Sequence, residues 1–344
     1  MSQTDRRAVA AWLLVCAALV FLVVVVGGVT RLTRSGLSIV EWQPLIGILP
    51  PLSEADWLAL FAKYRETPEY RLVNFGMGLE GFKSIFWWEY IHRLLARAVG
   101  LVFLIPFVYF LVRRRLEAPL AWKLGGIFLL GAAQGALGWF MVKSGLVDDP
   151  KVSPFRLTAH LGLALVIFAA QFWLALGLLA PRQRPVERFA GALPWVILAM
   201  ALSGGMVAGL RAGYAYPTFP LMNGHFIPPE ILLLEPWWMN FGYNMATVQF
   251  VHRSFFWLLA VLIPLAWWRY RGTPAAHALM AAFVLQATLG IATLLAGIPV
   301  VLGTAHQGGA VVLLAAALWN AHAARAREAS TIGGFSLLQR SVRP

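Results

Sequence analysis

The stretch AWLLVCAALVFLVVVVGGV at residues 11–29 carries no charged side chain, and apolar runs of this length decide the fold class. About 20 apolar residues in a helix cross the roughly 30 Å hydrocarbon core of a bilayer. Of the 344 residues, 60% are hydrophobic and only 12% are charged, which is outside the range of soluble domains. We therefore predict an all-α integral membrane protein with eight transmembrane helices. The expected spans are 11–30, 87–112, 122–142, 156–179, 192–210, 246–268, 275–296 and 302–322.

Basic residues set the expected orientation of these spans, because cytoplasmic loops are enriched in Lys and Arg. The residues that fall on one side are Arg6, Arg7, Arg113, Arg114, Arg115, Lys123, Arg182, Arg184, Arg188, Arg269, Arg271, Arg325 and Arg327. Both termini are therefore predicted to be cytoplasmic, in a multi-pass protein of the bacterial inner membrane. No small-residue cleavage site follows the first run, so we interpret it as a retained span rather than a signal peptide.

Charge and cysteine content exclude several function classes. The net charge is +13, but the basic residues are scattered between apolar runs and form no stripe that would bind nucleic acid. A contact with membrane lipid is a weaker additional role for these charges. Cys16 is the only cysteine, which excludes disulfides within the chain, thiolate zinc sites and cysteine-ligated iron–sulfur clusters.

Two long loops, 31–86 and 211–245, are expected on the outer side of the membrane. They are rich in Trp, Pro and Gly, as is typical of segments that lie at the membrane interface. Ser53 followed by Glu54, Ala55 and Asp56 predicts a capped helix in the first loop. This helix either rests on the outer surface as an amphipathic segment or is an ordinary solvent-exposed helix.

The spans repeat in two sets of four. The matching segments, in order, are Gly27-Gly28 with Gly204-Gly205, Arg34-Ser35-Gly36 with Arg211-Ala212-Gly213, Glu89 to Arg93 with Gln249 to Arg253, Gln134 to Gly138 with Gln286 to Gly290, and Leu157 to His160 with Gly303 to His306. Because each set has an even number of spans, the sets run in the same direction. We predict two parallel four-helix-bundle repeats, at 1–185 and 186–344.

Four of the seven histidines, His92, His160, His252 and His306, fall on alternate spans that run from outside to inside. Each lies within about one to two turns of the expected start of its span. A single such histidine is commonly an interhelical hydrogen-bond partner or a lining of a polar cavity. Two per bundle at one depth fit the axial ligands of a heme better, and a metal ion usually recruits three or more ligands. His225, His277 and His322 need no special role.

Charged neighbours distinguish the two halves. Arg93 and Arg253 each follow a histidine and could pair with heme propionates, although Arg93 could equally pair with Glu89 one turn earlier. Arg97 extends the same face and is not assigned. Gln249 takes the place of Glu89 in the second half and cannot ionise. If one half holds a heme that reacts, we therefore expect it to be the first half, which has the acid. The simpler interpretation is that Glu89 caps its helix or pairs with Arg93.

In these residues the sequence resembles the heme A synthase family, over roughly residues 11 to 325, in the lineage that lacks paired loop cysteines. The segments that carry the resemblance are Gly28 to Thr33, Ser35 to Ser38, Glu41-Trp42, Glu89 to Arg93, Thr158-Ala159-His160, Phe250 to Arg253 and His306-Gln307. In this order, on eight spans, they are strongly specific. Because the loop cysteines of other members have no counterpart here, a mechanism that needs a loop disulfide is not expected.

The resemblance implies oxidation of the C8 methyl group of heme O to a formyl group, which gives heme A for cytochrome oxidase. It also implies that His252 and His306 ligate the iron of a resident heme b with Arg253 nearby, that His92, His160 and Arg93 frame the substrate heme O, and that Glu89 is the catalytic acid. Heme O synthase and cytochrome oxidase assembly factors are expected neighbours. No flavin, nucleotide or cluster motif identifies the electron donor.

Two other functions fit parts of the pattern. A di-heme cytochrome b that only transfers electrons would explain the four histidines, and an asymmetric quinone site would then account for Glu89. A transporter would explain parallel repeats with polar residues inside the membrane, but transporter sites usually lie at the midplane, whereas these histidines are predicted near the outer face.

Overall fold

The fold is helical throughout the part of the chain that the computed structural model describes, residues 1–41, 46–145, 150–181 and 185–324. The eight helices long and apolar enough to cross a membrane are α1 (Gln3–Leu32), α4 (Leu79–Val112), α5 (Ala118–Gly145), α6 (Pro154–Leu179), α7 (Arg188–Gly209), α9 (Met245–Tyr270), α10 (Pro274–Leu295) and α11 (Val300–Ala324). The shorter elements are η1 (Ile46–Ile48), α2 (Glu54–Arg65), α3 (Pro68–Leu72), η2 (Ala212–Tyr214), η3 (Trp237–Met239) and α8 (Asn240–Tyr243). The prediction of an all-α protein with eight apolar spans is confirmed.

Two helices begin well before the expected spans. Helix α1 starts at Gln3 instead of residue 11, because the Ser2 hydroxyl accepts a hydrogen bond from Asp5 N and caps the helix. Helix α4 starts at Leu79 instead of residue 87. Its first two turns carry Glu80 and Lys83, so hydropathy does not detect them, yet they are helical because their other face is buried.

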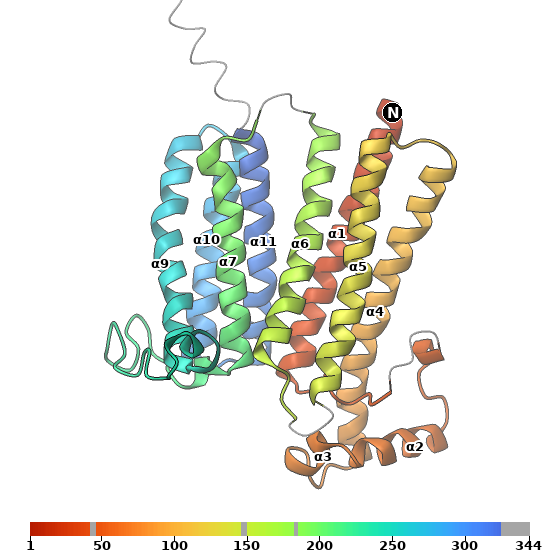
Figure 1. Cartoon of the computed structure of the whole chain (residues 1–344), viewed down its shortest axis with the longest axis vertical. Coiled ribbons are helices and arrows are strands. Elements are labelled where there is room, and N and C mark those ends of the chain that lie inside the picture. The colour runs from red at the N-terminus through yellow and green to blue at the C-terminus, as the bar shows by residue number, and fades with distance from the viewer. Residues whose placement is uncertain (42–45, 146–149, 182–184, 325–344) are drawn as a thin grey trace, which may run out of the picture.

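That buried face packs on the first outer loop. Phe82 of α4 is fully buried and stacks with Tyr64 of α2, with ring centroids 5.2 Å apart. Trp57 of α2 meets Phe86 of α4 edge-to-face at 5.0 Å. Helices α2 and α3 therefore form a small aromatic cluster around the first turns of α4, at the lower end of the bundle in Figure 1.

The predicted cap of α2 is confirmed. The Ser53 hydroxyl accepts a hydrogen bond from Asp56 N at 3.2 Å, and the Asp56 carboxylate accepts one from Ser53 N at 3.0 Å. This reciprocal pair is a capping box, which satisfies two backbone donors at the start of the helix. Because α2 packs on α4 and α3, it is part of the folded outer layer, whether or not lipid also contacts it.

The long helices pack in two groups of four. In the first group α1 and α5 each contact α4 and α6, and in the second α7 and α10 each contact α9 and α11. The groups meet where α6 contacts α7 and α1 contacts α11, with α6 and α11 also touching (Figure 1). The domain boundary and the internal repeat stay predictions. One observation agrees with the predicted repeat: Arg34 after α1 and Arg211 after α7 both adopt left-handed backbone conformations, with φ of 54° and 55°.

The start of α1 and the end of α11 lie at the same end of the bundle, and both long loops lie at the other (Figure 1). The described members of the basic set predicted to be cytoplasmic are at the first end, where the Met1 amino group pairs with Glu117 at 2.9 Å. The predicted positions Trp42, Arg182, Arg184, Arg325 and Arg327 lie outside the described residues. The second loop exposes Trp237 and Trp238, which suits an interface between water and lipid.

Candidate active site

A single cavity of about 1710 Å³ runs between the two groups of helices. Side chains from all eight long helices line it, and most of the lining is apolar. Small-molecule pockets usually measure about 300–1,000 Å³, so this cavity has room for more than one ordinary ligand. All four of the singled-out histidines line it, as does Glu89. The two histidine sites that the sequence suggested separately therefore line one cavity.

Each of the four histidines packs against a glycine of the neighbouring helix. A Cβ atom built on the glycine would meet the Cε1 atom of the ring at 2.9 Å for Gly27 and His92, 3.0 Å for Gly138 and His160, 3.1 Å for Gly204 and His252, and 2.7 Å for Gly290 and His306. Carbon atoms normally stay about 3.5–4.0 Å apart, so any larger residue would displace the ring. The glycines therefore fix where each imidazole lies.

The histidines form two pairs. His92 on α4 and His160 on α6 lie within range of each other's charge, and the same holds for His252 on α9 and His306 on α11. In each group the two helices that carry the pair are on opposite sides of the ring of four. This is the arrangement that two axial ligands of one heme require.

The predicted distance from the helix start is wrong for one of the four histidines, and their common depth stays a prediction. His160, His252 and His306 lie within about two turns of the starts of their helices, as expected. His92 lies about three and a half turns after Leu79, because the outer extension of α4 precedes the membrane span. The helix start is therefore not a measure of depth for α4.

Polar neighbours hold the histidines in place. Ser203 Oγ lies 2.9 Å from His252 Nδ1, which leaves Nε2 as the atom that can face a metal. The two matched glutamines donate to the backbone of the histidines: Gln134 Nε2 to the His160 carbonyl at 3.0 Å, and Gln286 Nε2 to the His306 carbonyl at 2.9 Å. Gln134 Nε2 also lies 3.4 Å from His160 Nε2. The glutamines had been noted only as markers of the repeat.

Glu89 is almost fully buried, with 2% of its surface exposed. Its Oε1 atom pairs with Arg93 Nη2 at 2.6 Å, and its Oε2 atom accepts hydrogen bonds from Ser38 Oγ at 2.7 Å and Ile39 N at 2.9 Å. The simpler interpretation, that Glu89 and Arg93 pair, is therefore confirmed. The same carboxylate also lines the cavity, so the pairing does not remove it from the site.

Both arginines that follow a histidine tie an outer loop to a helix. Arg93 also donates to the carbonyls of Ile39 and Glu41, at 2.9 and 3.2 Å. Arg253 donates to four carbonyls of the second loop, those of Tyr216, Thr218, Pro220 and Leu221. Their expected contact with heme propionates stays a prediction, because in this structure their donors point to backbone oxygens.

The remaining histidines are elsewhere. His277, near the start of α10, accepts a hydrogen bond from Trp267 Nε1 at 3.0 Å, and His322 packs against the Trp173 ring. His225 forms a small bridge with Met222 in the second loop. Among residues that the structure describes, no group of three or more His, Cys, Asp or Glu side chains could hold a metal ion. Paired imidazoles, glycine contacts and apolar walls fit a heme instead.

A family model for cytochrome oxidase assembly proteins, COX15-CtaA, matches residues 10–318. The chain belongs to this family. Three curated relatives in it are named heme A synthase. The protein of Nitrosospira multiformis is 57% identical and that of Nitrosomonas eutropha 54%, and the matches cover 93% and 92% of this chain and 94% and 93% of the relatives. The Rhodospirillum centenum protein is 50% identical, with 95% and 91% covered.

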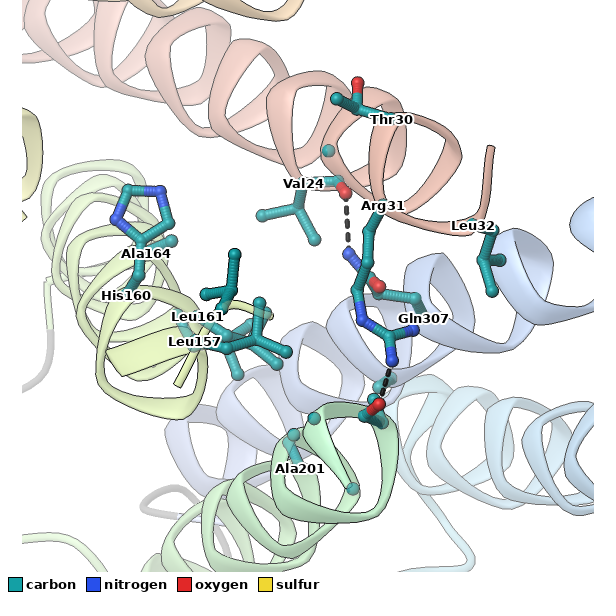
Figure 2. A pocket seen from close by; sticks show the side chains of 18 of the residues that line it. Val24, Thr30, Arg31, Leu32, Leu157, His160, Leu161, Ala164, Ala201 and Gln307 are labelled. Atoms are coloured by element: carbon teal, nitrogen blue, oxygen red, sulfur yellow. Dashed lines mark hydrogen bonds between the residues drawn. The ribbon is translucent and has the colours of Figure 1, made fainter. Parts of the chain in front are cut away.

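Sequence reasoning missed two features of the site in this COX15-CtaA member. Gly138 and Gly290 were noted only as parts of repeated segments. In the structure each of the four histidines has a glycine opposite its ring, and this common pattern could have marked both residues as part of the site. Arg31 was noted only as part of a family segment. It lines the cavity at the end of α1 and donates across the gap to the carbonyl of Ala208 on α7 (Figure 2).

Proposed function

We propose that this protein is a heme A synthase, which oxidises the C8 methyl group of heme O to a formyl group for cytochrome oxidase. The observation that carries the proposal is one cavity with two histidine pairs and a buried acid, Glu89, beside only one of them. Membership of the family and the names of the relatives support the same activity. The alternative, a di-heme cytochrome that converts no substrate, is not favoured, since those relatives are named as a synthase.

In this proposal the two halves have different tasks. His252 and His306 hold a resident heme b, whose iron supplies the redox chemistry that side chains lack. His92 and His160 frame heme O, the substrate. Each of two hydroxylations would insert one oxygen atom of dioxygen into a C–H bond of the methyl group, while two electrons from an external donor and two protons reduce the other oxygen atom to water. Loss of one further water from the resulting gem-diol gives the aldehyde.

Glu89 acts on the substrate side as a fixed negative charge and a proton carrier. Three donors hold its carboxylate beside His92: Arg93, Ser38 and the backbone of residue 39. A carboxylate held in this way stabilises positive charge that develops next to it, at little cost in reorganisation. Its second task is to accept a proton during oxidation of the methyl group.

We further propose that the basic end of the bundle faces the cytoplasm, with both termini, in a bacterial inner membrane. The histidine pairs then lie towards the outer leaflet. Electrons come from a partner that remains unidentified. Heme O synthase and oxidase assembly factors are proposed neighbours, because heme O and heme A are both too apolar to pass freely through water.

The test is the Glu89→Gln variant, co-expressed with a source of heme O, with Glu80→Gln as the matched control. Glu80 lies on the same helix but is exposed and pairs only with Lys83. We expect Glu89→Gln to retain its hemes and to lose formation of heme A, measured by mass spectrometry of extracted hemes. Normal heme A yield in Glu89→Gln would remove Glu89 from the mechanism, and extraction of only heme b and heme O from wild type would support the di-heme cytochrome.

A further inference from the structure

Three arginines gather at the outer end of the cavity, where the two groups of helices meet. Arg31 is in the last turn of α1, and Arg34 and Arg211 directly follow α1 and α7. All three line the cavity. Figure 2 shows Arg31 extended from α1 towards α7, near Gln307 of α11, whose amide donates to the Val24 carbonyl at 2.7 Å.

Electrostatic interactions connect the three arginines through Arg211 and one acid, Glu69. Arg211 lies within electrostatic range of Arg31, and both Arg34 and Arg211 lie within range of Glu69 on α3. Glu69 is buried, with 4% of its surface exposed. Burial raises the pKa of Glu69, and the two arginines only partly offset this rise. The cluster therefore holds three arginines and a single neighbouring carboxyl group, that of Glu69.

Neither Arg34 nor Arg211 makes a side-chain hydrogen bond or ion pair with any residue in the described part of the chain. Arg31 donates to a single neutral carbonyl. Arg31 is half-buried, whereas Arg34 and Arg211 are exposed at the cavity, so the guanidinium donors of Arg34 and Arg211 are open to solvent or to a bound anion. The residues themselves thus leave room for at least one anionic group at this point.

The two arginines that seemed suited to propionates are engaged otherwise. Arg93 is held by Glu89 and two loop carbonyls, and Arg253 by four loop carbonyls. Rotating either one towards the cavity would break these bonds and release an outer loop. Arg31 donates one hydrogen bond to a carbonyl, and the Arg34 and Arg211 side chains donate none to the described residues. These three guanidinium groups therefore have donors available to a ligand.

We propose that Arg31, Arg34 and Arg211 form a carboxylate-binding site that takes the propionate groups of a porphyrin in the cavity. The inference rests on the proposed function only in taking a porphyrin as the ligand, not in taking heme A as the product. A guanidinium presents two parallel donors that match a carboxylate, and such charge-assisted hydrogen bonds are the strong ones. Because the cluster joins the ends of α1 and α7, it can serve a porphyrin from either half.

Arg34 and Arg211 occupy matching places after α1 and α7, and both adopt a left-handed backbone conformation. Non-glycine residues rarely adopt positive φ, and Arg114 after α4 and Ile298 after α10 share this conformation at helix ends. In that conformation the chain turns sharply at the helix end, while the side chain stays at the cavity. We infer that the turn places the guanidinium where the ligand carboxylates lie.

The test compares hemin with hemin dimethyl ester, in which both propionates are methyl esters and carry no charge. Both are titrated into the full-length protein purified from heme-deficient cells, and binding is followed by the Soret band. The variants are Arg31→Gln, Arg34→Gln and Arg211→Gln. The control is Arg71→Gln, an exposed residue of α3 that does not line the cavity.

We expect wild type and Arg71→Gln to bind hemin more tightly than the ester. Each of the three variants should lose affinity for hemin by roughly tenfold or more, since a hydrogen bond to a charged group contributes about 1.5–3 kcal/mol and 1.4 kcal/mol is a factor of ten. Affinity for the ester should be unchanged, which also shows that the variant is folded. The midpoint potential of the bound heme should fall, because a positive charge beside it has been removed.

Three results would overturn the site. Equal losses for hemin and ester would mean that the arginines only support the fold. Unchanged affinity for hemin in all three variants would place the propionates elsewhere. Equal binding of hemin and ester by wild type, with less phospholipid co-purified from the variants, would assign the cluster to lipid phosphate. None of these results depends on whether heme A is made, so the proposed function and the site are tested separately.

Discussion

Replacing Gly290 by alanine tests the contact that positions His306. The new Cβ atom would lie 2.7 Å from His306 Cε1, so the ring must move by about 0.8 Å or more to reach a normal carbon–carbon distance. A coordination bond tolerates a change of only about 0.2 Å. The ring must therefore either leave its position or strain the packing around it, and in both cases the ligation of iron is weakened.

The effect on overall stability is small by comparison. Overpacking costs about 1–3 kcal/mol, whereas alanine in place of glycine stabilises a helix by about 1 kcal/mol. The net cost of Gly290→Ala is thus about 0–2 kcal/mol, and the variant should fold. We expect less bound heme, or a heme whose low-spin spectrum has changed, measured by the ratio of Soret to protein absorbance and by electron paramagnetic resonance.

Two controls separate this effect from a general one. Gly126→Ala on α5 places a Cβ in open space, so it should leave the hemes unchanged. Gly204→Ala meets His252 at the longer distance of 3.1 Å, so its effect should be smaller than that of Gly290→Ala. The reasoning fails if Gly290→Ala binds heme with the wild-type occupancy and spectrum, or if Gly126→Ala loses as much.

Three further predictions concern other parts of the molecule. His306→Ala should lose the resident heme while heme O still binds, as shown by a pyridine hemochromogen assay. Arg253→Lys keeps the charge but cannot reach four carbonyls, so hydrogen exchange at residues 216–221 should rise by about tenfold or more, measured by mass spectrometry. The Ser53 hydroxyl and backbone hold the pKa of Asp56 below its usual range, so this carboxylate stabilises α2 above the ordinary pKa of 3.8. That stabilisation should disappear as pH falls through the lowered pKa, seen as faster exchange in α2.

Hydropathy and the repeated segments predicted the fold class, the eight spans and the four histidines that share a cavity. These signals depend on local composition and on helix periodicity, which a sequence contains directly. The start of α4 was missed because Phe82 and its neighbours are buried by the loop helices rather than by lipid. Hydropathy measures the apolar content of a segment, not the tertiary contact that buries one face of it.

The roles of the arginines were harder to predict. A propionate partner and a loop anchor need the same residue type next to the same histidine, so sequence could not separate them for Arg93 and Arg253. The structure separates them because a guanidinium that already donates to several carbonyls has few donors left. The sequence around Arg31 gives no signal of its role, because the carbonyl to which it donates is on α7, far along the chain.

The difference between Glu89 and Gln249 extends to the loops that face them. In the first half the loop offers two donors, Ser38 Oγ and the backbone N–H of residue 39, and both point to the carboxylate. In the second half the loop offers an acceptor, the Tyr216 carbonyl, which receives the Gln249 amide at 3.0 Å. A carboxylate at position 249 would face that carbonyl and be repelled, and an amide at position 89 would leave one donor without an acceptor. The acid and the amide are therefore each matched to their own loop, so the chemical asymmetry between the halves is a property of the fold and not of one substitution.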